Sequence, residues 1–127
     1  MQSKEEAEII PKDKFYKKRL RNLLRATDEE RLYKNGELTA IVFINKLFFL
    51  KFATWIANGR YKRKGYTSKC LSKIKKRHPL LFAKVQKGNM PSYIFAKKND
   101  FKRLIKIPKF FGLHPGTLFY WKRNSKK

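Results

Sequence analysis

The side chains with the clearest capacity for chemistry form a short basic and aromatic segment near the middle of the chain. Between Asn58-Gly59 and Thr67, lysines and arginines alternate with Tyr61 and Tyr66. Cationic side chains contact phosphates and aromatic rings stack on bases, so this composition suits nucleic-acid binding. A lysine-rich surface loop whose tyrosines pack inward explains the same residues equally well. The side chains that we assign here to phosphate contact are Arg60, Lys62, Arg63 and Lys64.

The sequence offers little for metal or redox chemistry. Cys70 is the one cysteine, and His78 and His114 are the only histidines, whereas a structural zinc site needs four ligands. A lone cysteine forms no intramolecular disulfide, which favours a reducing, cytoplasmic or nucleoid-associated location. The charged N-terminus lacks the apolar run of a targeting peptide. We therefore expect no metal and no cofactor.

Catalytic groups are equally scarce. Metal-dependent nucleases and polymerases need converging carboxylates, and Asp100 is the only acidic residue after residue 37. The chain has no P-loop motif and no recognisable nucleophilic triad. Two histidines with lysines can cleave RNA, but His78 precedes a proline and His114 lies in a predicted turn. We expect the protein not to be an enzyme.

Charge is distributed very unevenly along the chain. Lys and Arg number 33 against nine Asp and Glu, which gives a net charge of +24. Residues 1–37 hold ten bases and eight acids, a net of +2, so residues 38–127 hold 23 bases and one acid, a net of +22. A compact body with this charge needs a polyanionic partner. We expect a near-neutral, helical N-terminal appendage over 1–37 and a basic nucleic-acid-binding body over 38–127.

Helices dominate the expected secondary structure. Residues 12–25 have the pattern of a basic amphipathic helix. Thr27 and Glu30 have capping-box spacing, which predicts a second helix from Asp28 to the Asn35-Gly36 turn.

The main core element is expected at 38–58, a helix that is apolar nearly all round, with a short strand at 40–44 before it. Its length suits a membrane span, but Lys46 and Lys51 in its middle oppose one. A basic helix over 68–77 and a hairpin of strands at 81–85 and 92–96 follow. This order resembles the recognition helix and wing of winged-helix domains over 38–98. The nucleic-acid contacts expected on that helix are Lys69, Lys73, Lys76 and Arg77.

The most specific motif lies at the C-terminus. Asp100 can cap a helix over about 101–107, Gly112 permits an abrupt helix end, and Pro115 suits the first turn of a second helix. Leu118 and Trp121, three residues apart, would share one helical face. Residues 101–123 therefore resemble the helix-turn-helix of transposase- and repressor-type DNA-binding proteins.

The resemblance implies a particular docking on DNA. The start of the second helix would meet base edges, and flanking bases would meet phosphates. Pro108 departs from the family, because it shortens or kinks the first helix. The implied base-facing residues are His114, Gly116, Thr117 and Tyr120, and the implied phosphate contacts are Lys109, Lys122 and Arg123. The alternative for this segment is an aromatic C-terminal stretch that docks on the core.

These patterns lead to one principal expectation and two rivals. We expect a mainly α fold with a small β-hairpin (α+β), in a regulatory, replication-accessory or architectural DNA-binding protein of a mobile element or virus. Duplex DNA is the expected partner, with a possible homodimer through residues 1–37 and no membrane. The first rival is an RNA-binding structural component of a ribonucleoprotein particle, similar to ribosomal proteins. The second is a peripheral membrane or virion-lining protein.

Overall fold

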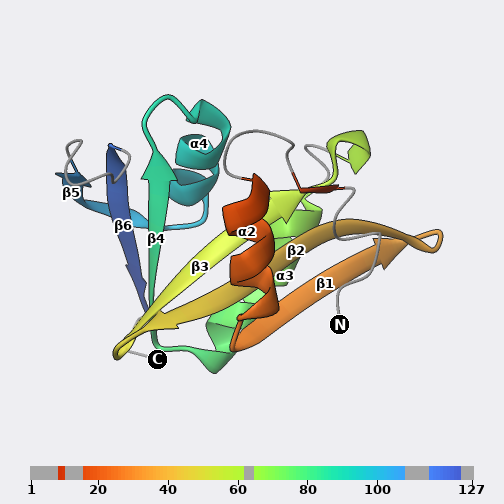
Figure 1. Cartoon of the computed structure of the whole chain (residues 1–127), viewed down its shortest axis with the longest axis horizontal. Coiled ribbons are helices and arrows are strands. Elements are labelled where there is room, and N and C mark those ends of the chain that lie inside the picture. The colour runs from red at the N-terminus through yellow and green to blue at the C-terminus, as the bar shows by residue number, and fades with distance from the viewer. Residues whose placement is uncertain (1–8, 11–15, 62–64, 108–114, 124–127) are drawn as a thin grey trace.

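A six-stranded mixed sheet forms the centre of the molecule, as a computed structural model shows (Figure 1). The structure describes residues 9–10, 16–61, 65–107 and 115–123. The strands are β1 (Asp28–Lys34), β2 (Glu37–Leu47), β3 (Leu50–Ala57), β4 (Leu80–Gln86), β5 (Lys102–Ile107) and β6 (Gly116–Lys122). The helices are α2 (Tyr16–Leu24), α3 (Tyr66–Arg77) and α4 (Met90–Lys98), with a short 3₁₀ helix η1 (Gly59–Tyr61). The expectation of a mainly α fold is therefore wrong.

The sheet consists of two antiparallel halves joined by one parallel contact. Its order is β1-β2-β3-β4-β6-β5. Strands β1, β2 and β3 pair antiparallel, as do β4, β6 and β5. Strands β3 and β4 run parallel and meet at a single pair, Phe52 with Phe82. Figure 1 shows them diverging from that point, so that the sheet opens into a V.

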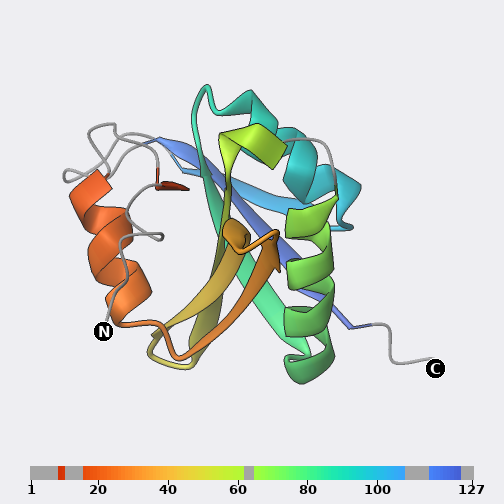
Figure 2. The ribbon, with the colours of Figure 1, turned by 90° about the vertical axis from the view of Figure 1, so that its right-hand side faces the viewer.

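Helices cover both faces of the sheet (Figure 2). Helix α2 lies on one face, and α3 and α4 lie on the other. The cluster on the α2 face includes Leu23, Ile41 and Phe43, while Leu71 and Phe119 belong to the cluster under α3 and α4. No helix within the described ranges is long and apolar enough to cross a membrane.

The apolar run over 38–58 is a strand pair rather than the expected core helix. Residues 38–44 of β2 are all buried, because this strand is covered on both faces. A strand buried on both sides has a continuous apolar sequence, which periodicity alone does not distinguish from a buried helix. The expected strand at 40–44 is confirmed as part of β2, and the rest of the run continues through a hairpin into β3.

Residues 28–34 also form a strand instead of the expected helix. The Thr27 hydroxyl donates to the Ile44 carbonyl on β2, so it does not cap a helix. The predicted turn at Asn35-Gly36 is confirmed, but it joins β1 to β2. Both turn residues have positive φ angles, 54° and 76°, as a two-residue hairpin turn requires. The division of the chain at residue 37 stays a prediction.

The C-terminal helix-turn-helix is wrong, because both of its expected helices are strands. Residues 102–107 form β5 and residues 116–122 form β6, which pair with each other. Thr117 and the aromatic residues of β6 are strong strand formers. Leu118 and Trp121 lie on opposite faces of a strand, so their spacing of three defined no common face. Gly112 and the other expected turn residues up to His114 lie outside the described ranges.

The winged-helix hairpin is half correct. The expected strand at 81–85 is confirmed within β4, whereas residues 92–96 belong to helix α4. Pro91 occupies the first turn of α4, and the Asn89 side chain accepts a hydrogen bond from the Ser92 amide. An Asn cap followed by proline is a helix start, and this signal outweighs the short apolar run that suggested a strand. The expected helices at 12–25 and 68–77 correspond to α2 and α3.

Candidate functional site

The opening between β3 and β4 is the most distinctive feature of the sheet. At its closed end the rings of Phe52 and Phe82 lie 5.8 Å apart, centroid to centroid. Beyond this pair, no ladder partner joins the facing edges of β3 and β4 in the part of the chain that the structure describes. Each strand pairs normally on its other edge. The facing edges can therefore offer backbone donors and acceptors to an extended guest chain.

Helix α3 begins at the open end of this cleft. Its N-cap residue, Gly65, has a φ angle of +79°, a left-handed conformation that favours glycine. As a glycine, this residue supplies no side-chain cap, and the first turn of the helix carries no acidic residue. The first backbone N–H groups of a helix have no intrahelical acceptor and carry the positive end of the helix dipole. This end of α3 thus suits an anionic group.

The connection from β3 to α3 is anchored by specific hydrogen bonds. The Asn58 amide side chain donates to the Leu38 carbonyl at 2.9 Å, and the Tyr61 hydroxyl donates to Glu37 at 2.8 Å. The Tyr61 and Tyr66 rings lie 6.0 Å apart. Tyr61 and Tyr66 therefore pack with the protein instead of standing free to stack on bases. The bases Lys62, Arg63 and Lys64 belong to this connection but lie outside the described residues.

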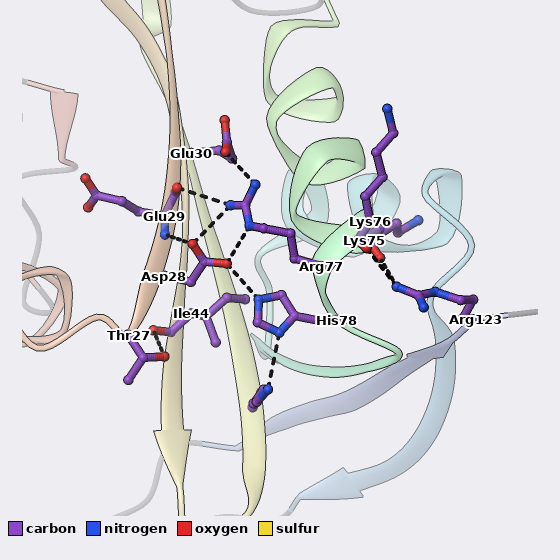
Figure 3. A network of polar contacts seen from close by, with 11 residues as sticks. Thr27, Asp28, Glu29, Glu30, Ile44, Lys75, Lys76, Arg77, His78 and Arg123 are labelled. Atoms are coloured by element: carbon purple, nitrogen blue, oxygen red, sulfur yellow. Dashed lines mark hydrogen bonds and ion pairs between the residues drawn. The ribbon is translucent and has the colours of Figure 1, made fainter.

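The C-terminal end of α3 is held by a dense polar network (Figure 3). Arg77 donates to Asp28 at 3.0 Å and to Glu30 at 2.7 Å, and His78 Nε2 lies 2.7 Å from Asp28 Oδ2. Arg123 donates to the last-turn carbonyls of Lys75 and Lys76, at 3.2 and 2.9 Å. This end of the helix is therefore satisfied by the protein's own side chains.

The electrostatics of the network follow from these contacts. Burial raises the pKa of Asp28, but hydrogen bonds from Arg77 and His78 outweigh it, so the pKa lies below its ordinary value. The same hydrogen bonds to Asp28 and Glu30 raise the pKa of Arg77. On its other side, the His78 ring has Nδ1 3.4 Å from Lys51 Nζ. An ammonium group only donates, so Nδ1 accepts from Lys51 and the Nε2 proton points to Asp28.

On the α2 face, the open cleft carries a titratable side chain, Lys84. It lies on β4, two residues beyond the Phe82 contact, and is half-buried. Burial lowers its pKa, and the positive charge of Lys18 on α2 lowers it further. Strands β3 and β4 and helices α2 and α3 carry no carboxylate in their sequences. This side of the cleft is therefore cationic.

The residues expected at a nucleic-acid interface fall into several separate places. Arg60 lies in η1, while Lys69, Lys73, Lys76 and Arg77 lie along α3. Gly116, Thr117, Tyr120 and Lys122 lie on β6, and Arg123 follows it. Lys62, Arg63, Lys64, Lys109 and His114 lie outside the described ranges.

The structure brings together only part of this set. Arg123 reaches the end of α3 beside Lys76 and Arg77, but Arg77 is engaged by Asp28 and Glu30. Gly116 is glycine for a packing reason, since a Cβ there would collide with the Val85 carbonyl. No groove-reading helix exists at this position.

Sequence reasoning missed the cleft, Lys84 and the role of Asp28. One signal was available, the pattern of a β-α-β unit. This pattern consists of an apolar run, a glycine at a helix start, an amphipathic helix and a second apolar run. That pattern predicts two parallel strands with the helix N-terminus at their carboxyl ends. It was obscured because 38–58 was interpreted as one helix.

Comparison with known proteins gives a consistent picture of the fold. No protein-family model and no curated protein matches the sequence. The ribosomal-protein-S18-alanine N-acetyltransferase from Escherichia coli has a similar structure, with a TM-score of 0.70, 14% identity, and coverage of 100% of this chain and 95% of that one. A GNAT-family acetyltransferase from Bacillus cereus matches with a TM-score of 0.72 and 16% identity, over 94% of this chain and 86% of that one.

A third solved structure contains a bound ligand. A ribosomal L7/L12 alpha-N-protein acetyltransferase in complex with coenzyme A matches with a TM-score of 0.63 and 13% identity, over 84% of this chain and 70% of that one. For another matching structure, the matched part is only 58% of that chain. At these identities the likeness establishes the fold, which is that of GNAT acetyltransferases.

These findings correct the functional expectations drawn from the sequence. The three solved structures described above are acetyltransferases, not helix-turn-helix, winged-helix or ribosomal proteins. The interpretation as a non-enzymatic DNA-binding protein, with RNA as the alternative partner, is therefore wrong. That interpretation took the excess of positive charge as evidence for a nucleic-acid partner, but charge without the fold does not define the partner.

Proposed function

We propose that this protein is an acetyltransferase that uses acetyl-CoA. The observation that carries the proposal is the cleft between β3 and β4, with the N-terminus of α3 and its N-cap glycine at the open end. The likeness in fold to solved acetyltransferases, one of them in complex with coenzyme A, supports it. A reducing compartment such as the cytoplasm suits this activity and the lone, buried Cys70.

The described residues, together with three bases that precede them in the sequence, would suit the parts of acetyl-CoA. The diphosphate would lie at the first turn of α3, where the backbone N–H groups and the helix dipole favour negative charge. Lys62, Arg63 and Lys64 directly precede that turn in the sequence and would add positive charge. The extended arm of the cofactor would lie between the unpaired edges of β3 and β4, as an added strand does. When bound, acetyl-CoA supplies an acetyl thioester for transfer to an acceptor amine.

The acceptor would approach from the α2 face, beside Lys84. Two lysines here, Lys84 and Lys18, disfavour a further positive charge, so a bound amine would lose its proton more readily than in water. The same charges would hold acidic groups of the acceptor. We therefore propose an amine flanked by acidic groups, such as the N-terminus of an acidic peptide.

Cofactor binding is tested by a matched pair of serine substitutions on α3. Ser68 lies in the first turn, and Ser72 lies one turn further along the same helix. Glutamate in a first turn favours the helix itself but repels a diphosphate, so Ser68→Glu should weaken acetyl-CoA binding by about tenfold or more. Ser72→Glu should leave the affinity nearly unchanged. Calorimetric titration measures both, and equal affinities for the two variants would refute this placement of the diphosphate.

The acceptor side is tested by peptides that differ only in charge. Release of free coenzyme A thiol is measured with acidic and neutral peptides of equal length. Lys84→Gln should reduce the preference for the acidic peptide by roughly three- to tenfold, because one nearby cation is lost. Lys87→Gln, an exposed position just after β4, is the control. A wild-type preference for the neutral peptide would contradict the acidic acceptor without affecting cofactor binding.

A further inference from the structure

The turn between β2 and β3 exposes the two most accessible large apolar side chains recorded in the described part of the chain. Phe48 is 85% exposed and Phe49 is 83% exposed, and the neighbouring Leu47 is 55% exposed. The strands pair as far as Leu47 with Leu50, so the two phenylalanines form a two-residue turn at the tip of a long hairpin. Because these two side chains are not buried, packing in the core does not explain why they are apolar.

The turn itself gains nothing from these residues. Phe48 has a φ angle of +57°, a left-handed conformation that is unfavourable for a bulky side chain. The other hairpin, between β1 and β2, uses Asn35-Gly36, the residues that such turns favour. A strained, exposed aromatic residue is a sign of function outside the fold.

The hairpin residues next to the two phenylalanines are apolar and basic. Lys46 and Lys51 face each other across the hairpin, one residue pair behind the turn, and Lys46 is exposed whereas Lys51 Nζ lies 3.4 Å from His78 Nδ1. Leu80, at the start of the adjacent strand β4, is 39% exposed and pairs with Lys122 of β6. No acidic residue lies between 38 and 80, so the tip has no carboxylate in its own hairpin.

We propose that this aromatic tip, residues 46–51, docks the protein on anionic phospholipid membranes. Aromatic rings beside lysines are the composition of segments that enter the boundary between headgroups and acyl chains. Lysines near an anionic leaflet add electrostatic attraction. A second copy of this chain is a poor occupant, because each copy carries a net charge of +24.

The location of the tip leaves the cleft accessible during docking. The hairpin ends where β3 and β4 meet, and α3 begins at the opposite, open end of the V (Figure 1). Membrane docking therefore stands independently of the acetyl-transfer proposal, and either can fail without the other.

The test uses a variant that removes the rings while improving the turn. Only the first of the two turn residues has a positive φ, so Phe48→Gly together with Phe49→Asn suits the backbone and should maintain or raise thermal stability. Binding is measured by flotation with phosphatidylcholine vesicles and with vesicles of phosphatidylcholine and phosphatidylglycerol at a ratio of about 7 to 3. We expect the wild type to bind only the anionic vesicles and the double variant to bind them at least about tenfold more weakly.

A second variant keeps both rings and measures how much charge attraction contributes to binding. Lys46→Gln should weaken binding about fivefold, the loss of one lysine near an anionic surface. Equal binding of wild type and double variant to anionic vesicles would overturn the proposal. The proposal would also be overturned if the double variant lost affinity for single-stranded RNA, or no longer formed a dimer in sedimentation, while its binding to vesicles stayed unchanged.

Discussion

The two ends of helix α3 differ in the contacts that the rest of the protein makes with them. At the C-terminal end, Arg123 binds the last carbonyls and Arg77 and His78 reach Asp28. At the N-terminal end, the N-cap residue is Gly65, which turns the chain and has no side chain to cap the helix. The same element thus has one end that side chains of the protein hold in place and one end at which we propose that a ligand binds. The difference indicates that a binding function should be sought at the end of the helix for which the described residues show no side-chain cap.

The largest difference between the two ends of α3 is expected when the carboxylate of Asp28 is removed. Asp28→Ala leaves Arg77 and His78 without their shared acceptor, which should lower the free energy of unfolding by about 2–3 kcal/mol. Acetyl-CoA affinity should change little, because the open end of α3 is untouched. Urea denaturation and calorimetric titration measure the two quantities.

Glu29→Ala is the matched control for this substitution. Glu29 is the next residue on β1, is more exposed, and pairs only with Arg31 among the contacts recorded for its carboxylate. Its removal should cost less than about 1 kcal/mol. Equal losses for the two variants would mean that the network of Figure 3 contributes nothing beyond an ordinary surface ion pair.

A smaller effect is expected at the open end. Gly65→Ala places a Cβ at a φ angle of +79° with no atom close to it, so the cost is conformational strain of about 1–2 kcal/mol. Gly59→Ala, in η1, has equal space and no positive φ, and should be nearly neutral. Thermal unfolding compares the two. If both were neutral, the first turn of α3 would not depend on the glycine as described.

Low pH should reversibly weaken the polar network at the C-terminal end of α3, and this is the smallest effect that we expect. The pKa of Asp28 is lower in the folded state than its ordinary value, so its stabilising contribution is present at higher pH. It is lost as the pH falls below about 4 and passes the folded-state pKa. Denaturation midpoints of the wild type should therefore fall more steeply than those of Asp28→Asn over this window. Parallel slopes would show that Asp28 does not titrate with folding.

The parts of the fold that the sequence predicts well are those with local signals. Helix α3 is marked by an amphipathic pattern that ends before Pro79, and β4 by its short apolar run. The Asn35-Gly36 turn is equally local. In contrast, the β2–β3 hairpin has no turn signal, since Phe48 and Phe49 occupy its turn. Without that signal, two strands appear as one apolar helix.

The site depends on contacts that no local pattern contains. The cleft exists because β3 and β4, separated by α3 in the sequence, form a backbone pair only at Phe52 and Phe82. The partners of Asp28 lie 49 and 50 residues away along the chain. Charge was visible in the sequence, but its interpretation needed the fold. An excess of lysine and arginine fits a nucleotide cofactor, an acidic acceptor or a membrane as well as it fits DNA.

The most direct test of the central claim is an amide chemical-shift titration of the full chain with acetyl-CoA. We predict saturable shifts concentrated at the Tyr66, Thr67 and Ser68 amides and along the facing edges of β3 and β4. The amides around Arg77 and His78 should stay in place. Shifts centred on the C-terminal end of α3, or no saturable change at all, would contradict the assignment of the open end as the cofactor site.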